Sequence, residues 1–170
     1  MRIPTRAMYF FYGALAFAVC ASGCAGDASR TAATFNDGAA LVGELPANPL
    51  TWRVINCTVD PSNGTMSTLY GNDIAIGYAR THAQHDYPAG SVVSLVSWAQ
   101  KEDHRWYGAQ IPSQVKSVEF VTVSAGEKGD SQYSYEAYVG NPLKKTTAQP
   151  YGTPPERIAY LFSNRAAVMP

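Results

Sequence analysis

The chain has 170 residues, and its 13 Lys and Arg residues balance its 13 Asp and Glu residues. Because the basic residues form no stripe or cluster that would bind phosphates, we expect no nucleic-acid partner. The chain also lacks the block of like charges that is typical of an acidic solvating tail.

Residues 1–23 have the features of a bacterial export signal. Arg2 and Arg6 form a short basic region, and residues 7–21 are apolar, which is short of the ~20 residues of a spanning helix. The small residues before Cys24 resemble a lipobox, in which the cysteine thiol receives a diacylglycerol and the chain is cut just before it. The alternative is ordinary signal-peptide cleavage with Cys24 unmodified, which would give a periplasmic or secreted protein.

A lipid on Cys24 would make the membrane a partner of the chain. Ala25 follows the cysteine in place of the aspartate that resembles an inner-membrane retention signal. We therefore expect an outer-membrane lipoprotein that faces the periplasm. Residues 24–48 are rich in Ala, Gly, Thr and Asp and are expected to form a flexible tether, and residues 49–170 are expected to form one compact domain.

Three cysteines occur in the chain, and Cys57 alone remains once Cys20 leaves with the signal and Cys24 takes the lipid. An unpaired thiol in an oxidising compartment survives best when it is buried. Cys57 lies in an apolar run, so we expect it to be a small core residue of a strand.

The domain reads in chain order as strands with two helices. Strands are predicted over 52–59 and 65–70, with turn-forming residues between them. Asn72 is expected to cap a short helix over 73–81. Further strands are predicted over 91–99, which is apolar on both faces, over 115–124 and over 131–139, which alternates. We predict a mainly β (α+β) fold: an antiparallel sheet with a short helix after the second strand and a C-terminal helix.

The last fifteen residues, 156–170, read as that C-terminal helix. Thr153 and Glu156 have the spacing of a capping box, and Pro154 suits the first helical position. Arg165 lies near the predicted C-terminal end, where a cation suits the helix dipole. The helix offers few ionisable side chains, so we expect it to dock on the core.

Trp106 and Tyr107 follow a charged loop over 101–105. They can form a partner-binding edge or pack against the core, and the second is the commoner outcome for aromatic side chains.

Four stretches together resemble the cytochrome P-460 / cytochrome c′-beta family. They are "WRVI", "GTMSTLYGND", "YPAGSVVSLVSW" and "VEF", which begin at Trp52, Gly64, Tyr87 and Val118, and a final helix follows them. The resemblance implies a mainly β, periplasmic or secreted haem protein that oxidises hydroxylamine or binds nitric oxide. It also allows a homodimer, since relatives tend to pair across sheet edges.

The chain departs from this family at the positions associated with haem. The family attaches haem through C-x-x-C-H near the final helix, and the sequence contains no such motif. Leu95 stands where the hydroxylamine-oxidising branch has a lysine bonded to haem, and Ser67 stands where an arginine is frequent. We therefore expect no covalent haem and no other resident cofactor, with the final helix taking the place of the haem-bearing segment.

The resulting hypothesis is a haem-free, non-catalytic module that binds a small ligand or a protein. Ser67, Leu95 and Phe120 are the candidate pocket residues, and the ligand is expected to be small and apolar or amphipathic. The sequence contains neither G-x-S-x-G nor a glycine-rich phosphate loop, so we name no catalytic residue.

Two alternatives stay open. Non-covalent haem would need an axial ligand, for which His82, His85, His104, Met66 and Tyr78 are the candidates. His82 and His85 are also three residues apart and could share a copper or zinc ion if both lay on one helix face.

Overall fold

The computed structural model describes residues 36–82, 86–127, 130–148 and 151–167. The signal, Cys24, the first part of the predicted tether and His85 lie outside these residues. Residues 36–170 form one compact unit. None of the helices that the structure describes is long and apolar enough to cross a membrane.

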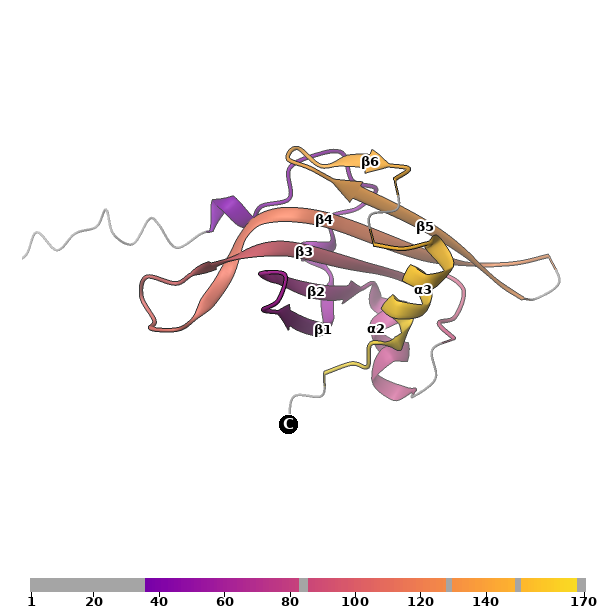
Figure 1. The fold of residues 1–170 in the computed structure, drawn as a ribbon. Helices are drawn as coiled ribbons and strands as arrows, with labels where there is room; N and C mark the ends of the chain where they lie inside the picture. Colours follow the sequence, from indigo (N-terminus) through magenta and orange to yellow (C-terminus); the bar gives the residue numbers. More distant parts are fainter. Residues whose placement is uncertain (1–35, 83–85, 128–129, 149–150, 168–170) are drawn as a thin grey trace, which may run out of the picture. The chain divides into compact units, whose positions relative to one another are not determined.

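The domain is built on one antiparallel sheet of six strands, which confirms the predicted fold class (Figure 1). Each strand pairs with the next in the chain, so their order in the sheet is the order of the sequence. The strands are β1 (Arg53–Asp60), β2 (Thr65–Gly71), β3 (Val92–Glu102), β4 (Gln110–Ala125), β5 (Ser131–Val139) and β6 (Lys144–Thr146). The helices are α2 (Asp73–Thr81) and α3 (Pro154–Ser163), with two short 3₁₀ turns, η1 (Asp37–Ala39) and η2 (Pro49–Thr51).

Helices α2 and α3 cover one face of the sheet (Figure 1). Ile76 of α2 and Leu161 and Phe162 of α3 pack there against apolar residues of the strands. The sheet contributes Ile55, Leu69, Val93, Leu95, Val121 and Val123, each no more than 5% exposed. Since burial of one such side chain is worth about 1.5–3 kcal/mol, this helix face holds much of the stability of the domain.

The segment before β1 covers the opposite face. Ala39, Leu41 and Leu45 pack against a second buried cluster, which includes Trp98 and Phe120. The Trp98 indole donates a hydrogen bond to the Ala39 carbonyl at 2.9 Å. Residues 36–48 were predicted to belong to a tether, but their apolar side chains complete this cluster. The packed domain therefore includes residues from Asn36 on.

Asn72 fixes the start of α2, as the sequence predicts. Its side-chain oxygen accepts hydrogen bonds from the backbone amides of Ala75, at 3.0 Å, and Val92, at 3.2 Å. Gly71 precedes it because a Cβ there would lie 2.8 Å from the Ile55 side chain. Close packing at Gly71 and helix capping by Asn72 together account for this pair of residues.

Helix α3 begins with the predicted capping box, in which the Glu156 carboxylate accepts the Thr153 amide at 2.8 Å. The predicted length was wrong, because the helix ends at Ser163. The Asn164 side chain caps it by donating to the Tyr160 carbonyl at 2.8 Å. The chain then runs to the sheet edge, where the Ala167 amide bonds the Ile55 carbonyl at 2.7 Å.

The β3–β4 hairpin extends further than predicted. Lys101 and Glu102 were read as loop residues, yet they pair in register with Ile111 and Gln110. Both charged side chains are exposed, so hydrophobic periodicity does not mark this end of the strand. Trp106 at its tip is 70% exposed, which makes the expectation of packing against the core wrong.

Cys57 is exposed, which corrects the prediction of a buried thiol. The register of β1 against β2 shifts between Val54 and Asn56, leaving Ile55 as the extra residue of a β-bulge. Beyond the bulge Cys57 pairs with Thr68. The bulge breaks the alternation of side chains along the strand. Although Cys57 lies in an apolar run of the sequence, its side chain is therefore exposed on the edge strand.

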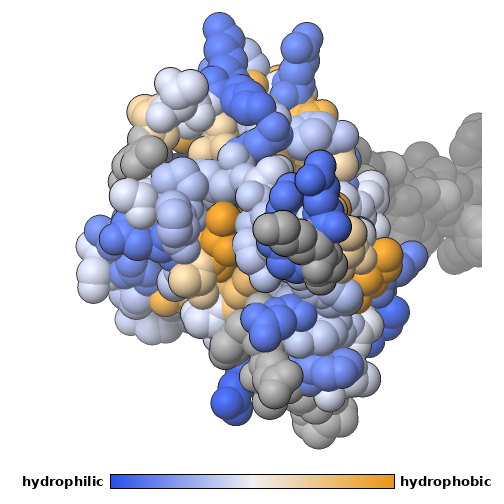
Figure 2. Space-filling view, turned by 90° about the vertical axis from the view of Figure 1, so that its right-hand side faces the viewer, coloured by the Kyte–Doolittle hydropathy of each residue, from blue (hydrophilic) through white to orange (hydrophobic). Residues whose placement is uncertain are grey.

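On the face shown in Figure 2, hydrophobic residues form small separate areas among hydrophilic residues.

Candidate functional site

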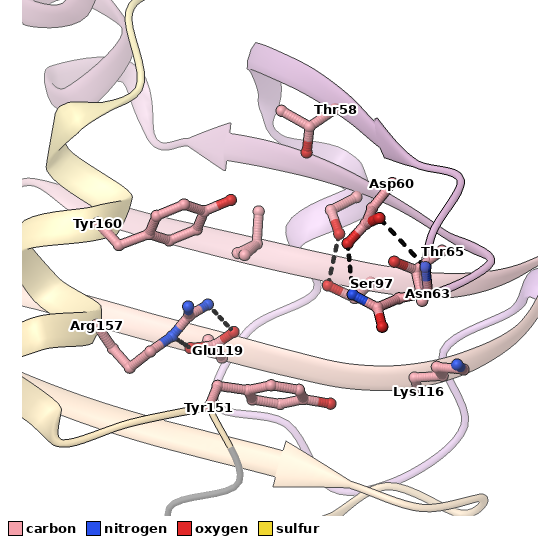
Figure 3. A pocket seen from close by; sticks show the side chains of 12 residues that line it. Thr58, Asp60, Asn63, Thr65, Ser97, Lys116, Glu119, Tyr151, Arg157 and Tyr160 are labelled. Carbon is pink, nitrogen blue, oxygen red and sulfur yellow. Dashed lines mark hydrogen bonds and ion pairs between the residues drawn. The ribbon is translucent and has the colours of Figure 1, made fainter.

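A pocket opens on the helix face of the sheet, beside α3. Its volume is about 450 Å³. Strands β1 to β4 form its floor and one wall, and α3 with the loop before it forms the opposite wall (Figure 3). The residues that line it are Thr58, Asp60, Asn63, Thr65, Ser67, Leu95, Ser97, Lys116, Glu119, Tyr151, Arg157 and Tyr160. This size lies in the range of small-molecule sites.

A buried ion pair joins the sheet to α3 in this pocket. Glu119 of β4 is 1% exposed, and Arg157 of α3 approaches it with two nitrogens. The distances are 2.9 Å from Nε to Oε2 and 2.8 Å from Nη2 to Oε1 (Figure 3). Two parallel hydrogen bonds of this kind fix both the position and the orientation of the guanidinium group.

Tyr135 of β5 completes the arrangement, because its hydroxyl donates to Glu119 Oε2 at 2.7 Å. Burial and the hydrogen bond to Glu119 raise the pKa of Tyr135 above its ordinary value. Burial alone would lower the pKa of Arg157, but the hydrogen bonds and charge of Glu119 outweigh it and raise that pKa. The arrangement therefore favours the charged form of Arg157 and the neutral form of Tyr135.

Two tyrosine rings flank the guanidinium group. Its central carbon lies 4.6 Å from the ring centre of Tyr160 and 5.5 Å from that of Tyr151. These distances are within the range of a cation–π interaction. Both tyrosines are more than 40% exposed, so their rings form the outer rim of the pocket.

Hydroxyl groups line the sheet side of the pocket. Ser67 and Ser97 are cross-strand partners, and their side-chain oxygens lie 2.7 Å apart. At the β1–β2 turn, the Asp60 carboxylate accepts the Asn63 side-chain amide at 2.7 Å, and this hydrogen bond lowers the pKa of Asp60. The pocket thus presents hydroxyls, an amide and charged groups, with Leu95 as the apolar part of the floor.

The structure brings two of the three predicted pocket residues together. Ser67 and Leu95 both line the cavity. Phe120 lies on the opposite face of the sheet, where its ring packs against Trp52 and Tyr138. Phe120 follows Glu119 in β4, and neighbours in a strand point to opposite faces. The lining combines polar side chains with Leu95 and two tyrosine rings, so it suits an amphipathic ligand better than a purely apolar one.

The candidate haem ligands lie away from this pocket. Met66 packs in the cluster on the opposite face, Tyr78 stacks on His82, and His104 lies in the β3–β4 hairpin. Of the residues that line the pocket, none is a cysteine, histidine or methionine. Tyrosine is a further class of haem ligand, but both rim tyrosines face the Arg157 guanidinium group. The pocket residues therefore do not fit a covalently attached haem.

His82 follows the last residue of α2 and serves as its C-cap. Its Nδ1 lies 2.7 Å from the Thr81 hydroxyl, and its ring stacks on Tyr78 with centroids 4.3 Å apart. The described residues contain no group of three or more His, Cys, Asp or Glu side chains placed to hold a metal ion. His85, its proposed partner in a metal site, lies outside them.

Glu119 and Arg157 were the residues that sequence reasoning missed. Glu119 stood in the sequence as a lone acidic residue among apolar neighbours of a predicted strand. A buried carboxylate requires a partner, so this position could have indicated an ion pair. Arg157 carries no such signal, because a single arginine in the first turns of an amphipathic helix is ordinarily a solvent-exposed residue.

Comparison with family models identifies a match over most of the domain. The family model for cytochrome P460 matches residues 46–153, which include β1 to β6 and end just before α3. A search of curated proteins found no match.

Proposed function

This chain belongs to the cytochrome P460 family, and we propose that it is a haem-free member that binds a small polar ligand without transforming it. One observation carries the proposal. Ser67 and Leu95, which replace residues tied to haem chemistry in the resemblance, line the pocket together with the Glu119–Arg157 ion pair. The family's cofactor position would thus be a polar cavity that α3 closes from one side.

The ion pair also supports a binding role over catalysis. A general base must have a free lone pair within reach of the proton that it removes. Glu119 already accepts three hydrogen bonds, two from Arg157 and one from Tyr135. Asp60 is engaged by the turn that it caps, through Ser62 and Asn63. Most of the roughly four acceptor sites of each carboxylate are thus occupied by hydrogen bonds that hold the fold.

The chemistry of the lining suggests the ligand class. Side-chain hydroxyls, the Asn63 amide and Lys116 can each bond a polar group, while Tyr151 and Tyr160 offer ring faces at the rim. We infer a small molecule with several hydrogen-bonding groups, because an apolar ligand would leave these groups unpaired.

The proposal is tested by thermal shift on residues 36–170, which contain both apolar clusters. The probes are a panel of monosaccharides, amino acids and short dicarboxylates, with hemin as a separate probe. We expect at least one panel member to raise the melting temperature of the wild type and not that of Ser97→Phe, which fills the pocket. Ser131→Phe, on an exposed strand position, is the matched control. A shift that survives Ser97→Phe, or no shift for any panel member, would count against the proposal.

We further propose that residues 1–23 are removed and that Cys24 carries a lipid that holds the domain at the outer membrane, facing the periplasm. Its support is the order of basic, apolar and small residues before the cysteine. Metabolic labelling with a fatty acid, compared between wild type and Cys24→Ser, tests this. Equal labelling of the two would refute it. The homodimer stays a prediction that solution mass measurement can check.

A further inference from the structure

We propose that the tip of the β3–β4 hairpin inserts its two aromatic rings into the interfacial region of a lipid bilayer. Trp106 is 70% exposed and Tyr107 is fully exposed. The other two tryptophans differ, since Trp98 is buried and Trp52 is partly buried against the sheet. Tryptophan and tyrosine combine an apolar body with a polar tip, which suits them to the boundary between headgroups and acyl chains.

The tip holds these rings on an ordered turn. The Asp103 amide bonds the Ala109 carbonyl at 2.9 Å, and the Ala109 amide bonds the Trp106 carbonyl at 3.1 Å. The Asp103 side chain also accepts the Arg105 amide at 2.9 Å. Because the backbone is already fixed, insertion would require little additional ordering of the chain.

The start of the domain lies at the base of the same hairpin. Asn36 donates its side-chain amide to the Pro112 carbonyl, and its side-chain oxygen accepts Lys101 Nζ at 3.3 Å. Lys101 and Pro112 belong to the two strands of this hairpin. In Figure 1, η1 accordingly lies at the end of the sheet from which the hairpin projects. Any segment that precedes Asn36 therefore joins the domain beside the hairpin that carries the rings.

The position of Asn36 beside the hairpin matters for a chain attached to a membrane through its N-terminal part. That attachment is the one part of the proposed function on which the proposal rests. The stretch from Cys24 to Asn36 can span at most roughly 40 Å when fully extended. β3 ends at Glu102, one residue beyond Lys101, and the turn that carries both rings follows directly, so the tip lies close to the point at which this stretch joins the domain. An anchor of this reach would bring the tip to the bilayer before the rest of the domain.

The size of the aromatic surface favours a bilayer over a protein partner. Each ring can bury about 150–250 Å², whereas a stable protein interface buries roughly 800 Å² on each side. The charges of the hairpin end also balance, with Lys101 and Arg105 against Glu102 and Asp103. An open hollow of about 570 Å³ there is lined by Glu102, Asp103, His104, Arg105, Tyr107 and Gly108. Such a surface suits zwitterionic headgroups, which carry both signs of charge.

The test uses the chain processed in the bacterial envelope and reconstituted into phosphatidylcholine vesicles, with and without brominated acyl chains. Bromine quenches tryptophan emission at short range, and flotation of the vesicles reports attachment separately. We expect brominated lipid to quench part of the wild-type emission. In Trp106→Phe, which retains Trp52 and Trp98 as a baseline, that part should disappear.

Equal emission of the wild type in brominated and ordinary vesicles, with the protein floating, would overturn the inference in favour of a protein partner for the rings. Quenching that persists in Trp106→Phe would overturn it as well. Loss of flotation would instead refute the membrane attachment on which it rests. Because Trp106 is exposed, the substitution should leave the melting temperature unchanged, which confirms that the variant is folded.

Discussion

Replacing Arg157 by methionine should destabilise the domain strongly. The change removes the guanidinium group and retains an unbranched side chain of similar length, so it isolates charge from packing. It leaves Glu119, which is 1% exposed, with the Tyr135 hydroxyl as its remaining hydrogen-bond donor among those that the structure shows. An uncompensated buried charge of this kind costs about 3–5 kcal/mol.

The loss of two cation–π contacts adds to this cost. Each such contact at a partly exposed site is worth about 0.5–1 kcal/mol. For a domain of this size the combined change of about 4–7 kcal/mol lowers the melting temperature by about 15–25 °C. The measurement is urea unfolding at neutral pH, which gives the free energy of unfolding and its slope.

Two control variants make the result specific. Lys145→Ala breaks the surface ion pair between Lys145, whose side chain is 59% exposed, and Glu136, whose side chain is 32% exposed. The change should lower the free energy of unfolding by no more than about 1 kcal/mol. Glu119→Leu combined with Arg157→Met removes both charges and should restore a large part of the stability lost in Arg157→Met alone. If Arg157→Met costs no more than Lys145→Ala, the ion pair does not hold α3 to the sheet and the reasoning fails.

Three further predictions follow from particular residues. Burial and neighbouring Tyr78 raise the pKa of Tyr87 to about 12, so the folded state favours its neutral form. The contribution of Tyr87 to the free energy of unfolding should be complete below about pH 10. It should fall by about 1.4 kcal/mol per pH unit between pH 10 and 12. In Tyr87→Phe the free energy of unfolding should fall less steeply over that range, and an unchanged slope would contradict the assignment. Cys57, the one cysteine of residues 36–170, should react with a thiol reagent in the native protein, whereas reaction that requires denaturant would show that it is buried. Gly43→Ala should destabilise the domain, because a Cβ there would collide with the Leu143 carbonyl and the residue has a φ of 146°. Gly77→Ala in helix α2, where an added Cβ meets no atom within 4 Å, should stabilise the domain by about 0.5–1 kcal/mol. Thermal melts that ranked the two variants the other way would refute both assignments.

Local signals predicted most of the secondary structure. The limits of α2 and of β5 agree with the prediction. Asn72 caps the helix, and the β5 sequence alternates between apolar and polar residues from Tyr133 to Ala137. The signals failed where polar residues continue a strand, as at Lys101 and Glu102, and where a bulge changes the face, as at Cys57. Neither feature leaves a periodic pattern in the sequence.

The candidate site was harder to predict because its parts come from distant segments. Ser67 and Leu95 came from the resemblance, and both line the pocket. Glu119 and Arg157 are 38 residues apart, and their pairing depends on how α3 crosses the sheet. The tether prediction failed for residues 36–48 for the same reason. Their few apolar side chains form no periodic pattern, and they are part of the core because they pack against Trp98 and its neighbours.

The absorption spectrum of the protein purified from a bacterial envelope that matures c-type cytochromes tests the central claim most directly. We predict no Soret band for the purified protein, a hemin spectrum that an equimolar amount of the protein neither shifts nor sharpens, and a polypeptide mass without porphyrin. A Soret band at one haem per chain that survives acid–acetone extraction would contradict the claim that this family member has dispensed with its cofactor.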